Sequence, residues 1–396
     1  MKILHTVEFY DPSVGGMQEV VKQISERLVK LGHDVTVATT KLPGRKSLNI
    51  RGVKIREFAI SGNLVRGLSG ETDKYQDFLI NSEFDVMVNF AAQQWATDLA
   101  FEVLDRVKAK KVFVPTGFSG LYLPEYKRYF EKMGDWMKKY DMNVFLSNDY
   151  RDINFARKVG VSPKKTTIIP NGAGEDEFLS PSGTDIRKKL GIPSNHFLIL
   201  LVGSHTGVKG HKEAIEIFSR AKIKNAALLI VGNIFGGGCS LSCPRKAFFF
   251  NLSPRRWFPA GDGKRLIITE LSREETVAAY QSADLFLFPS NIECSPIVLF
   301  EAMASRTPFL TADVGNSAEI VEWSGGAGIV LPTDKDAQGF ARVRIPGSVE
   351  ILEEIYHDSV RRQKMAEAGF QAWKKRFTWE KIALEYESLY RNLLKR

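Results

Sequence analysis

The 396-residue chain is long enough for two or three domains of ordinary size. Its 44% hydrophobic and 26% charged residues are typical of a packed globular protein and exclude a largely disordered chain. No apolar run approaches the roughly 18 residues of a membrane-spanning helix. Glu8 and Asp11 interrupt the N-terminus before a signal-peptide core could form. Three cysteines are too few for a secreted disulfide scaffold, so we expect a cytoplasmic protein.

The basic residues are concentrated in two segments. The formal net charge is +9. Residues 236–265 carry six basic residues against one acidic residue, and residues 361–396 carry ten against four. An excess of this kind favours anionic partners, which include phosphorylated substrates, nucleic acid and acidic membrane surfaces.

The first half of the chain alternates predicted strands and helices. Residues 3–7 form a short apolar strand, which a loop with Gly15 and Gly16 follows. Apolar residues then recur at helical spacing over 17–31, before a second strand at 34–40. This order predicts a parallel sheet with right-handed crossovers. The pattern continues with strands at 84–90, 110–116 and 142–147 and helices near 97–108 and 125–139.

A second series of the same kind follows residues 168–185, which have the Pro, Gly, Ser and Asp content of a linker. Its strands are predicted at 197–203, 226–232, 265–269, 284–290 and 307–313, and its helices at 211–222, 273–282 and 296–305. Two such series predict an α/β protein with two doubly wound, Rossmann-like domains facing across a cleft. We place these domains at 1–180 and 181–378, and we expect a last helix, 379–396, to pack back toward the first domain.

The segment 291–321 is the most informative for function. Ser295 is a good N-cap and Pro296 suits a first helical turn. The backbone N–H groups of Ile297 and Val298 then lie free at the helix N-terminus, where the partial positive charge favours a diphosphate.

Two glutamates flank this helix start. Glu301 is placed to accept hydrogen bonds from ribose hydroxyls, as acidic residues do in other nucleotide sites. Glu293 faces the other end of such a ligand, where the sugar lies. The alternative is that Glu293 caps a loop and Glu301 is a solvated helix residue.

The sequence E-C-S-P-I-V-L-F-E-A-M-A, with seven residues between Glu293 and Glu301, resembles the signature of retaining GT-B glycosyltransferases, in particular family 4. The opening MKILHTVEFYDPSVGGMQEVV is similar to the start of that family, and IIPNGAGEDEF to its interdomain motif. LLVGSHTGVKGHKEAI and ADLFLFPSNIECSP resemble its donor-binding segments. The resemblance therefore spans the chain.

Three positions depart from the family pattern. Ser204 stands where the family usually has arginine, while Lys209 matches the family lysine. His205 supplies part of the missing charge at most, because an unperturbed histidine is mostly neutral at pH 7. Thr116 precedes Gly117 where many relatives have a histidine, and Gly174 replaces an aspartate of the interdomain motif. These departures leave the donor sugar open.

The resemblance implies transfer of a hexosyl or N-acetylhexosaminyl group from a UDP- or GDP-linked sugar to an acceptor hydroxyl. It further implies retention of anomeric configuration, no bound metal and no cofactor. Glu293 and Lys209 are the expected catalytic residues. The expected donor-binding residues are Gly15, Gly16, Ser204, His205, Lys209, Ser295, Pro296, Ile297, Val298 and Glu301.

The acceptor is expected at the sheet-end loops of the first domain, where folds of this kind hold ligands. The candidate contacts are Trp95, Asp98, Thr116, Gly117 and Phe118. Trp95 either stacks on a sugar ring or is a buried anchor. The acceptor itself is a glycan, or a lipid-linked or protein-linked group.

Cys239 and Cys243 lack two further ligands nearby in the sequence for a zinc site. Free thiols are therefore expected, with a redox pair as the alternative. Asp334 and Asp336 have the D-x-D spacing of metal-dependent transferases, but they lie in a polar loop outside the sheet ends and are interpreted as a solvated turn.

The segment 236–265 joins its basic residues to five aromatic residues, Phe248, Phe249, Phe250, Trp257 and Phe258. This combination suits an anionic bilayer interface, so we expect peripheral contact with the inner face of the membrane. The alternative is that Phe248, Phe249 and Phe250 pack onto the second domain and the arginines are simply solvated.

Two other functions remain open from the sequence. A nucleotide-sugar epimerase can share the two-domain fold. A non-catalytic nucleic-acid-binding protein would explain the net charge, but the chain has no recognised nucleic-acid motif and its charge lies outside the predicted cleft. We therefore expect no nucleic-acid partner.

Overall fold

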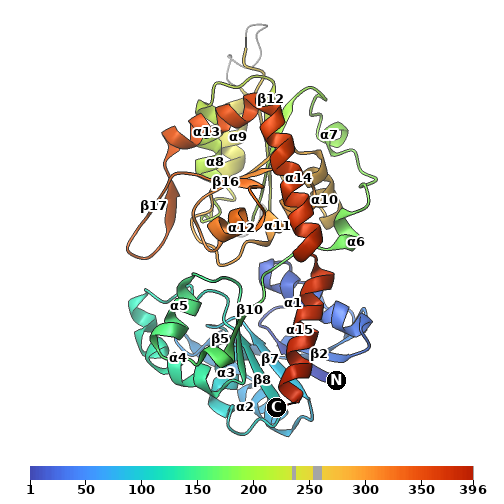
Figure 1. Ribbon diagram of the computed structural model, residues 1–396, viewed down its shortest axis with the longest axis vertical. Helices are drawn as coiled ribbons and strands as arrows, with labels where there is room; N and C mark the ends of the chain where they lie inside the picture. Colours follow the sequence, from blue (N-terminus) through green and yellow to red (C-terminus); the bar gives the residue numbers. More distant parts are fainter. Residues whose placement is uncertain (234–237, 253–260, 396) are drawn as a thin grey trace. The chain divides into compact units, whose positions relative to one another are not determined.

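The computed structural model describes residues 1–233, 238–252 and 261–395 (Figure 1). It divides into two compact units: unit 1 comprises Met1–Asn171 and Trp379–Arg396, and unit 2 comprises Gly172–Thr378. The boundary therefore lies earlier than the predicted residue 180. Ala173 explains this position, because it forms a parallel bridge with Thr378 and its N–H donates to the carbonyl of Phe377 at 3.0 Å. These contacts join the beginning of unit 2 to its end.

Unit 1 is built on an eight-stranded sheet with the order β10-β9-β8-β7-β1-β2-β4-β3. All neighbours are parallel except β3 and β4. The strands of unit 1 are β1 (Lys2–Thr6), β2 (Asp34–Thr40), β3 (Asn49–Ile50), β4 (Val53–Phe58), β5 (Ile60–Asn63), β6 (Gly67–Gly70), β7 (Val86–Phe90), β8 (Lys110–Val114), β9 (Met142–Phe145) and β10 (Thr166–Ile168). Its helices are α1 (Gly16–Lys30), α2 (Thr72–Asn81), α3 (Trp95–Val103), η1 (Pro124–Tyr126), α4 (Lys127–Lys139), α5 (Arg151–Lys158), η2 (Pro163–Lys165) and α15 (Trp379–Leu394).

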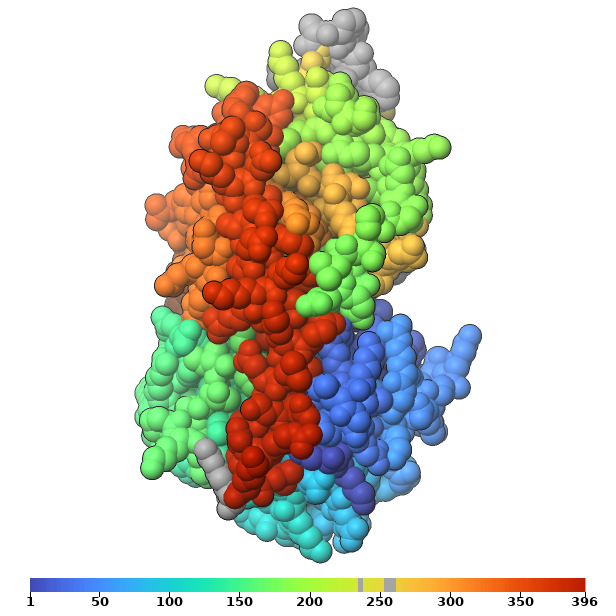
Figure 2. Space-filling view, turned by 45° about the vertical axis from the view of Figure 1, so that its right-hand side comes forward, coloured from blue at the N-terminus to red at the C-terminus, as the bar shows by residue number. Residues whose placement is uncertain are grey.

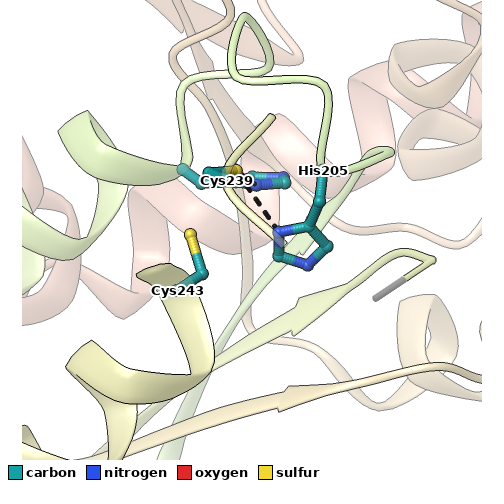
Figure 3. Close-up of side chains that lie close together, drawn as sticks. His205, Cys239 and Cys243 are labelled. Atoms are coloured by element: carbon teal, nitrogen blue, oxygen red, sulfur yellow. Dashed lines mark hydrogen bonds between the residues drawn. The ribbon is translucent and has the colours of Figure 1, made fainter. Parts of the chain in front are cut away.

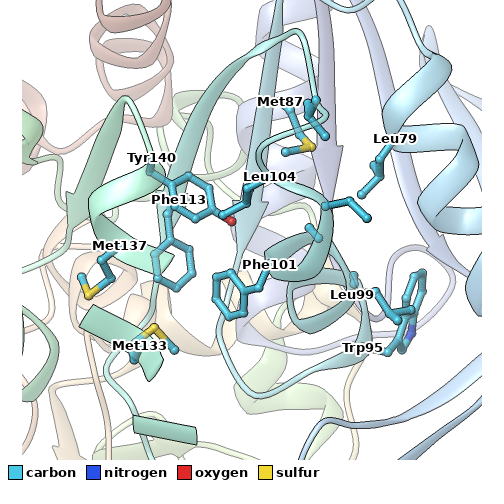
Figure 4. Close-up of a cluster of buried hydrophobic side chains, with 14 of the residues drawn as sticks. Leu79, Met87, Trp95, Leu99, Phe101, Leu104, Phe113, Met133, Met137 and Tyr140 are labelled. Atoms are coloured by element: carbon cyan, nitrogen blue, oxygen red, sulfur yellow. The ribbon is translucent and has the colours of Figure 1, made fainter. Parts of the chain in front are cut away.

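The core of unit 1 lies between helices and the sheet. Aromatic side chains fill much of it, and Phe101 stacks on Trp136. Phe113 stacks on Tyr140 (Figure 4). β7 is buried at every position, as expected for a parallel strand covered on both faces. The sequence analysis missed β4, the antiparallel hairpin of β5 and β6, and the helix α2.

The last helix belongs to unit 1 and packs against α1. Arg27 of α1 forms an ion pair with Glu380 at 2.6 Å, and Nε2 of His33 lies 2.8 Å from Oε1 of Glu387. Apolar and aromatic residues of this helix are buried, among them Ile382, Tyr386 and Tyr390. In the space-filling view the red residues of α15 lie against the blue surface of the N-terminal residues (Figure 2).

Unit 2 has a six-stranded parallel sheet with the order β13-β12-β11-β14-β15-β16. Its strands are β11 (Phe197–Val202), β12 (Ala226–Val231), β13 (Arg265–Thr269), β14 (Leu285–Phe288), β15 (Phe309–Thr311), β16 (Gly328–Val330) and the hairpin of β17 (Thr333–Lys335) and β18 (Ala341–Val343). Its helices are α6 (Glu175–Phe178), α7 (Ile186–Lys189), α8 (His211–Arg220), α9 (Ser242–Asn251), α10 (Arg273–Ser282), α11 (Ile297–Ala304), α12 (Ser317–Trp323), α13 (Ile345–His357) and α14 (Ser359–Arg376).

The central strands of unit 2 are almost wholly apolar. β11 reads FLILLV and β12 reads AALLIV, because helices cover both faces of a parallel sheet and leave little room for alternation. β11 pairs with β14, so the loops that follow these two strands leave the same edge of the sheet side by side. Within the described residues, no helix has both the length and the apolar composition that a bilayer crossing requires.

Candidate functional site

An ion pair joins the loops that follow β11 and β14. Nζ of Lys209 lies 2.6 Å from Oε1 of Glu293, and the hydroxyl of Ser290 donates to the same oxygen at 2.8 Å. The two side chains are 28% and 12% exposed, so both remain accessible to a ligand. Lys209 and Glu293 are 84 positions apart in the chain, and the structure brings together these two predicted catalytic residues.

The backbones of these two loops are in direct contact. Gly210 has a φ of +72°, and a Cβ atom there would lie 2.0 Å from the carbonyl oxygen of Pro289. Only glycine fits this close approach. The N–H of Asn291 also donates to the carbonyl of Val208 at 2.8 Å. The Lys209 loop is therefore held at a fixed distance from the Glu293 loop.

Helix α11 begins at Ile297, and its N-cap is Pro296 rather than the predicted Ser295. The cap makes no side-chain hydrogen bond. Ile297 and Val298 are half-buried and lie in the first turn, where the N–H groups have no acceptor within the helix. The partial positive charge expected at this helix start is therefore retained, one residue later than predicted.

Glu301 is a buried, charged residue rather than a solvated one. Its side chain is 4% exposed, and its Oε1 lies 2.6 Å from Nη1 of Arg273. Arg273 also donates to both carboxylate oxygens of Glu177, at 2.7 and 2.9 Å. The interpretation of Glu301 as a solvated helix residue is therefore wrong.

Arg273 is the charged residue of this site that sequence reasoning missed. It is the first residue of α10 and follows β13 by a short loop, at the same sheet edge as the other candidates. That position was the available signal, since ligand-binding residues of such folds come from the loops at the carboxyl ends of the strands.

Ser204 and His205 occupy different environments in the loop after β11. Ser204 is exposed, whereas His205 is 3% exposed and directed at Cys239. Burial lowers the pKa of His205, which keeps the ring neutral at pH 7. His205 therefore does not replace the family arginine as a cation beside a diphosphate.

His205 is instead part of a cluster with His211, Cys239 and Cys243. One ligand atom from each of the four residues lies within 4.8 Å of all the others. Nδ1 of His205 lies 3.4 Å and Nδ1 of His211 3.2 Å from Sγ of Cys239, and Cys243 lies beside them (Figure 3). The expectation that no two further ligands lie near the cysteine pair is therefore wrong: the sequence places both histidines far from it, but the fold brings them together.

In unit 1, Gly15 and Gly16 form the start of α1. Gly15 is the N-cap, with an extended backbone, and Gly16 is the first helical residue. A Cβ atom at Gly16 would meet nothing within 4 Å, so this helix start is open to a ligand. The two glycines follow the first strand, as the sequence predicts.

Trp95 and Asp98 lie inside unit 1, in contrast to the expected surface contacts. Both are fully buried. Nε1 of Trp95 donates to the hydroxyl of Thr40 at 2.8 Å, which supports the buried-anchor interpretation. Asp98 accepts from the hydroxyl of Tyr129 at 2.7 Å and from the N–H of Leu64 at 2.9 Å. Burial raises the pKa of Asp98 to about 6.

Thr116, Gly117 and Phe118 form a strained turn after β8. Their φ angles are +60°, +98° and +51°, a region that residues other than glycine rarely adopt. Gly117 donates its N–H to Asp152 at 2.9 Å, and Phe118 is buried, while Thr116 is half-exposed. Strain of this kind is concentrated at ligand-binding sites. Of these three residues, Thr116 alone is partly exposed.

Both halves of the chain match known protein families. Residues 182–371 match the family described as glycosyl transferases group 1, and residues 14–176 match Glycosyltransferase Family 4. The fold and these two matches define a glycosyltransferase with the GT-B fold. The second half of the chain is of the group 1 type and the first half of the family 4 type.

Several proteins are similar to the chain in sequence. D-inositol 3-phosphate glycosyltransferase of Corynebacterium aurimucosum is 29% identical over 58% of the chain, which spans about half, 52%, of that protein. The lipopolysaccharide glucosyltransferase WaaG of Escherichia coli is 26% identical over 81% of the chain and 83% of its own length. An uncharacterised glycosyltransferase of Methanocaldococcus jannaschii is 23% identical over 99% of the chain and 98% of its own length.

Solved structures show the same fold at lower identity. Sucrose-phosphate synthase of Thermosynechococcus elongatus superposes with a TM-score of 0.78 at 18% identity, over 100% of this chain and 99% of the other. HepE of Anabaena, solved with UDP-glucose, superposes with a TM-score of 0.73 at 16% identity, over 98% and 99%.

We expect Asp98→Asn to gain stability relative to the unsubstituted protein as the pH rises. The pKa of Asp98 is raised from 3.8 to about 6, so the folded protein keeps a proton that the unfolded chain loses within this window. Stability is therefore lost as the pH rises from about 4 to about 6, by roughly 3 kcal/mol at most, and asparagine has no such titration. Urea unfolding at about pH 4 and about pH 7 measures the difference between the two proteins.

Asp105→Asn is the control, because its side chain is 73% exposed. Its effect on the free energy of unfolding is expected to be nearly independent of pH. An equally flat difference for Asp98→Asn would show that the Asp98 carboxylate is not destabilised by burial.

We expect Arg273→Met to lower the free energy of unfolding of unit 2 by about 1–3 kcal/mol, because it removes a cation from the buried Glu301 carboxylate. The double variant with Glu301→Gln is expected to recover part of this loss, which a double-mutant cycle measures in urea unfolding. Lys335→Met, which breaks an exposed ion pair with Asp313, is the control and should cost less than about 1 kcal/mol. Additive losses in the cycle would contradict a direct Arg273–Glu301 interaction.

Proposed function

We propose that the chain transfers a hexosyl or N-acetylhexosaminyl group from a nucleotide sugar to an acceptor hydroxyl, with retention of configuration, in glycan or glycolipid assembly. The observation that carries this proposal is the Lys209–Glu293 ion pair in the loop before α11, in a chain whose second half matches the group 1 glycosyltransferases. The pair brings a cation and a carboxylate together, which supports a role for Lys209 at the leaving group and for Glu293 at the sugar.

The chemistry depends mainly on electrostatics. Charge develops on the diphosphate as the bond to the sugar breaks, and Lys209 and the N–H groups of Ile297 and Val298 are positioned to stabilise it. Before the donor binds, Glu293 holds the Lys209 ammonium group in place. In a front-face reaction, the leaving phosphate oxygen itself accepts the proton of the acceptor hydroxyl, so a separate general base is not required.

The nucleotide is proposed to bind beside Glu301. The Arg273 contact orients this buried carboxylate, which can then accept hydrogen bonds from ribose hydroxyls. Of UDP and GDP, UDP is favoured, because HepE is solved with UDP-glucose. WaaG, named as a glucosyltransferase, supports a hexosyl group. Gly15 and Gly16 are proposed as further donor contacts, and Thr116 as an acceptor contact.

We further propose that a surface around α9 contacts an anionic membrane, which would suit a lipid-linked acceptor. Leu241, Phe248, Phe249 and Leu252 are 88%, 61%, 59% and 54% exposed. Exposed Arg245 lies 5.8 Å from the Phe249 ring centroid, with exposed Lys246 beside it in the helix. Only Phe250 of the three consecutive phenylalanines packs inward, on Phe218.

The predicted membrane segment includes four residues that lie outside the described residues: Arg255, Arg256, Trp257 and Phe258. The proposal therefore rests on α9 and its flanks, where aromatic and basic side chains share an exposed surface, as they do at bilayer interfaces.

We expect Lys209→Ala to lower kcat/KM for sugar transfer roughly 30- to 900-fold, because the leaving group loses its main cation. This factor corresponds to a loss of about 2–4 kcal/mol in transition-state stabilisation. Glu293→Ala is expected to lower kcat with donor bound, whereas Glu301→Ala should chiefly weaken binding of the nucleotide. Transfer assays measure the kinetic constants, and thermal shifts with UDP-, GDP- and ADP-sugars measure donor binding. The UDP-sugar should give the largest shift.

Lys212→Ala is the matched control, because Lys212 is an exposed lysine close to Lys209 in the chain. It should leave transfer unchanged. Wild-type transfer by the Glu293→Ala, Glu301→Ala double variant would show that the site lies elsewhere.

We expect the protein to sediment with vesicles that contain anionic phospholipid, and to be released by salt. Replacing Arg245 and Lys246 with glutamine should weaken binding by about 1 kcal/mol for each charge. Phe248→Ser with Phe249→Ser should weaken it at every salt concentration. Val360→Ser is the control, since Val360 is 61% exposed but lies on α14. A protein that stays in the supernatant at low salt would contradict the membrane contact.

A further inference from the structure

We propose that His205, His211, Cys239 and Cys243 bind a structural Zn²⁺ ion in unit 2. The four ligand atoms already lie within 4.8 Å of one another. Two histidines and two cysteines are a ligand set that tetrahedral structural zinc sites use. This site is separate from the Lys209–Glu293 pair and is not part of the sugar-transfer chemistry.

The distances suit a tetrahedral ion. With Zn–S near 2.3 Å and Zn–N near 2.05 Å, neighbouring ligand atoms of a tetrahedron are roughly 3.3–3.8 Å apart. The two Nδ1–Sγ distances to Cys239, 3.4 and 3.2 Å, are already close to that range. The remaining ligand atoms lie within 4.8 Å of one another and would move closer together around the ion.

The charge of the bound site also suits its burial. His205, His211 and Cys243 are 3%, 2% and 2% exposed, and Cys239 is partly exposed. Two thiolates and two neutral imidazoles balance the charge of a divalent ion. The complex is then neutral, so the desolvation penalty of an isolated buried charge does not apply.

The polar atoms of the cluster are poorly satisfied by the protein alone. Nδ1 of each histidine contacts the sulfur of Cys239, which is a weak hydrogen-bond partner. Buried polar groups in this state are costly, and ions commonly satisfy them.

The backbone around the cluster is built for close approach. Gly238 has a φ of +56°, and a Cβ atom there would lie 2.1 Å from the carbonyl oxygen of His205. The N–H of Cys239 donates to that same carbonyl at 3.0 Å, and the N–H of Cys243 donates to the carbonyl of Cys239 at 2.9 Å. These contacts hold both cysteines against the histidine loop.

A metal here would also position Lys209, a consequence that rests on the proposed function. His205 and His211 lie at the two ends of the segment that carries Lys209, and both would be joined to Cys239 and Cys243 through the ion. The Lys209 ammonium group would then be held in place by a cross-link at each end of its loop.

The test measures metal directly in the full-length protein. Reduced protein is loaded with Zn²⁺, dialysed and analysed for metal by mass spectrometry, and a Co²⁺-loaded sample is examined by absorption spectroscopy. We expect about one Zn²⁺ per chain. We also expect thiolate-to-Co²⁺ charge transfer and strong tetrahedral Co²⁺ bands. A chelator should lower the thermal transition temperature of the zinc-loaded protein.

Cys243→Ser and His211→Ala should each lose the bound metal and the response to the chelator. Cys294→Ser is the matched control, because it removes the third cysteine and keeps all four ligands, so it should retain the metal. If the cluster variants fail to fold, the Co²⁺ spectrum and the chelator response of the unsubstituted protein still decide the question.

Unsubstituted, reduced protein that retains no Zn²⁺ and shows no thiolate–Co²⁺ band would overturn the proposal. A Cys239–Cys243 disulfide that binds no metal after reduction would also overturn it. Sugar transfer is measured separately: metal bound without transfer activity would leave the zinc site standing and count against the proposed function.

Discussion

The candidate donor site depends on the parallel pairing of β11 with β14. Ile199 is aligned with Leu285 and Leu200 with Phe286, so both strands end at the same edge of the sheet. The loops that follow can then meet, and Gly210 allows their backbones to touch. The Lys209–Glu293 ion pair and the start of α11 are both consequences of this register. A change that shifted β14 against β11 would therefore separate the site residues without replacing any of them.

The sequence predicted the parts of the fold that local pattern determines. β11 and β12 are long apolar strands, and the glycine loop before α1 has a recognisable start and stop, so these elements were found near their observed bounds. VKIREF alternates apolar and charged residues at its start, as a strand with one buried face does, so β4 had a signal that was overlooked. The hairpin of β5 and β6 was missed because ISGN is short and partly polar. Their stability comes from neighbouring strands and from α2, which no local window contains.

The site was predictable in its residue types but not in its contacts. The segment around Glu293 identified the helix start, yet the Arg273 partner of Glu301 comes from a different strand end. Trp95 and Asp98 lie in a sheet-end region, where ligand contacts are expected, but their side chains point into the core. His205 and His211 are 34 and 28 positions from Cys239, so no spacing motif connects them. Chemistry can be inferred from residue type, whereas side-chain direction depends on tertiary packing.

The loop from Gly203 to Gly210 carries side chains that point to two different places, the candidate donor site and the histidine–cysteine cluster. Lys209 reaches outward to Glu293, and His205 points inward to Cys239, with His211 of α8 beside it. A lysine on a flexible loop stabilises a leaving group poorly, because its ammonium group must be ordered during the reaction. In this structure the loop is held by the backbone contact at Gly210 and by the buried cluster of His205, His211, Cys239 and Cys243. Under the proposed function, residues that do not contact the sugar therefore keep the Lys209 ammonium group in position.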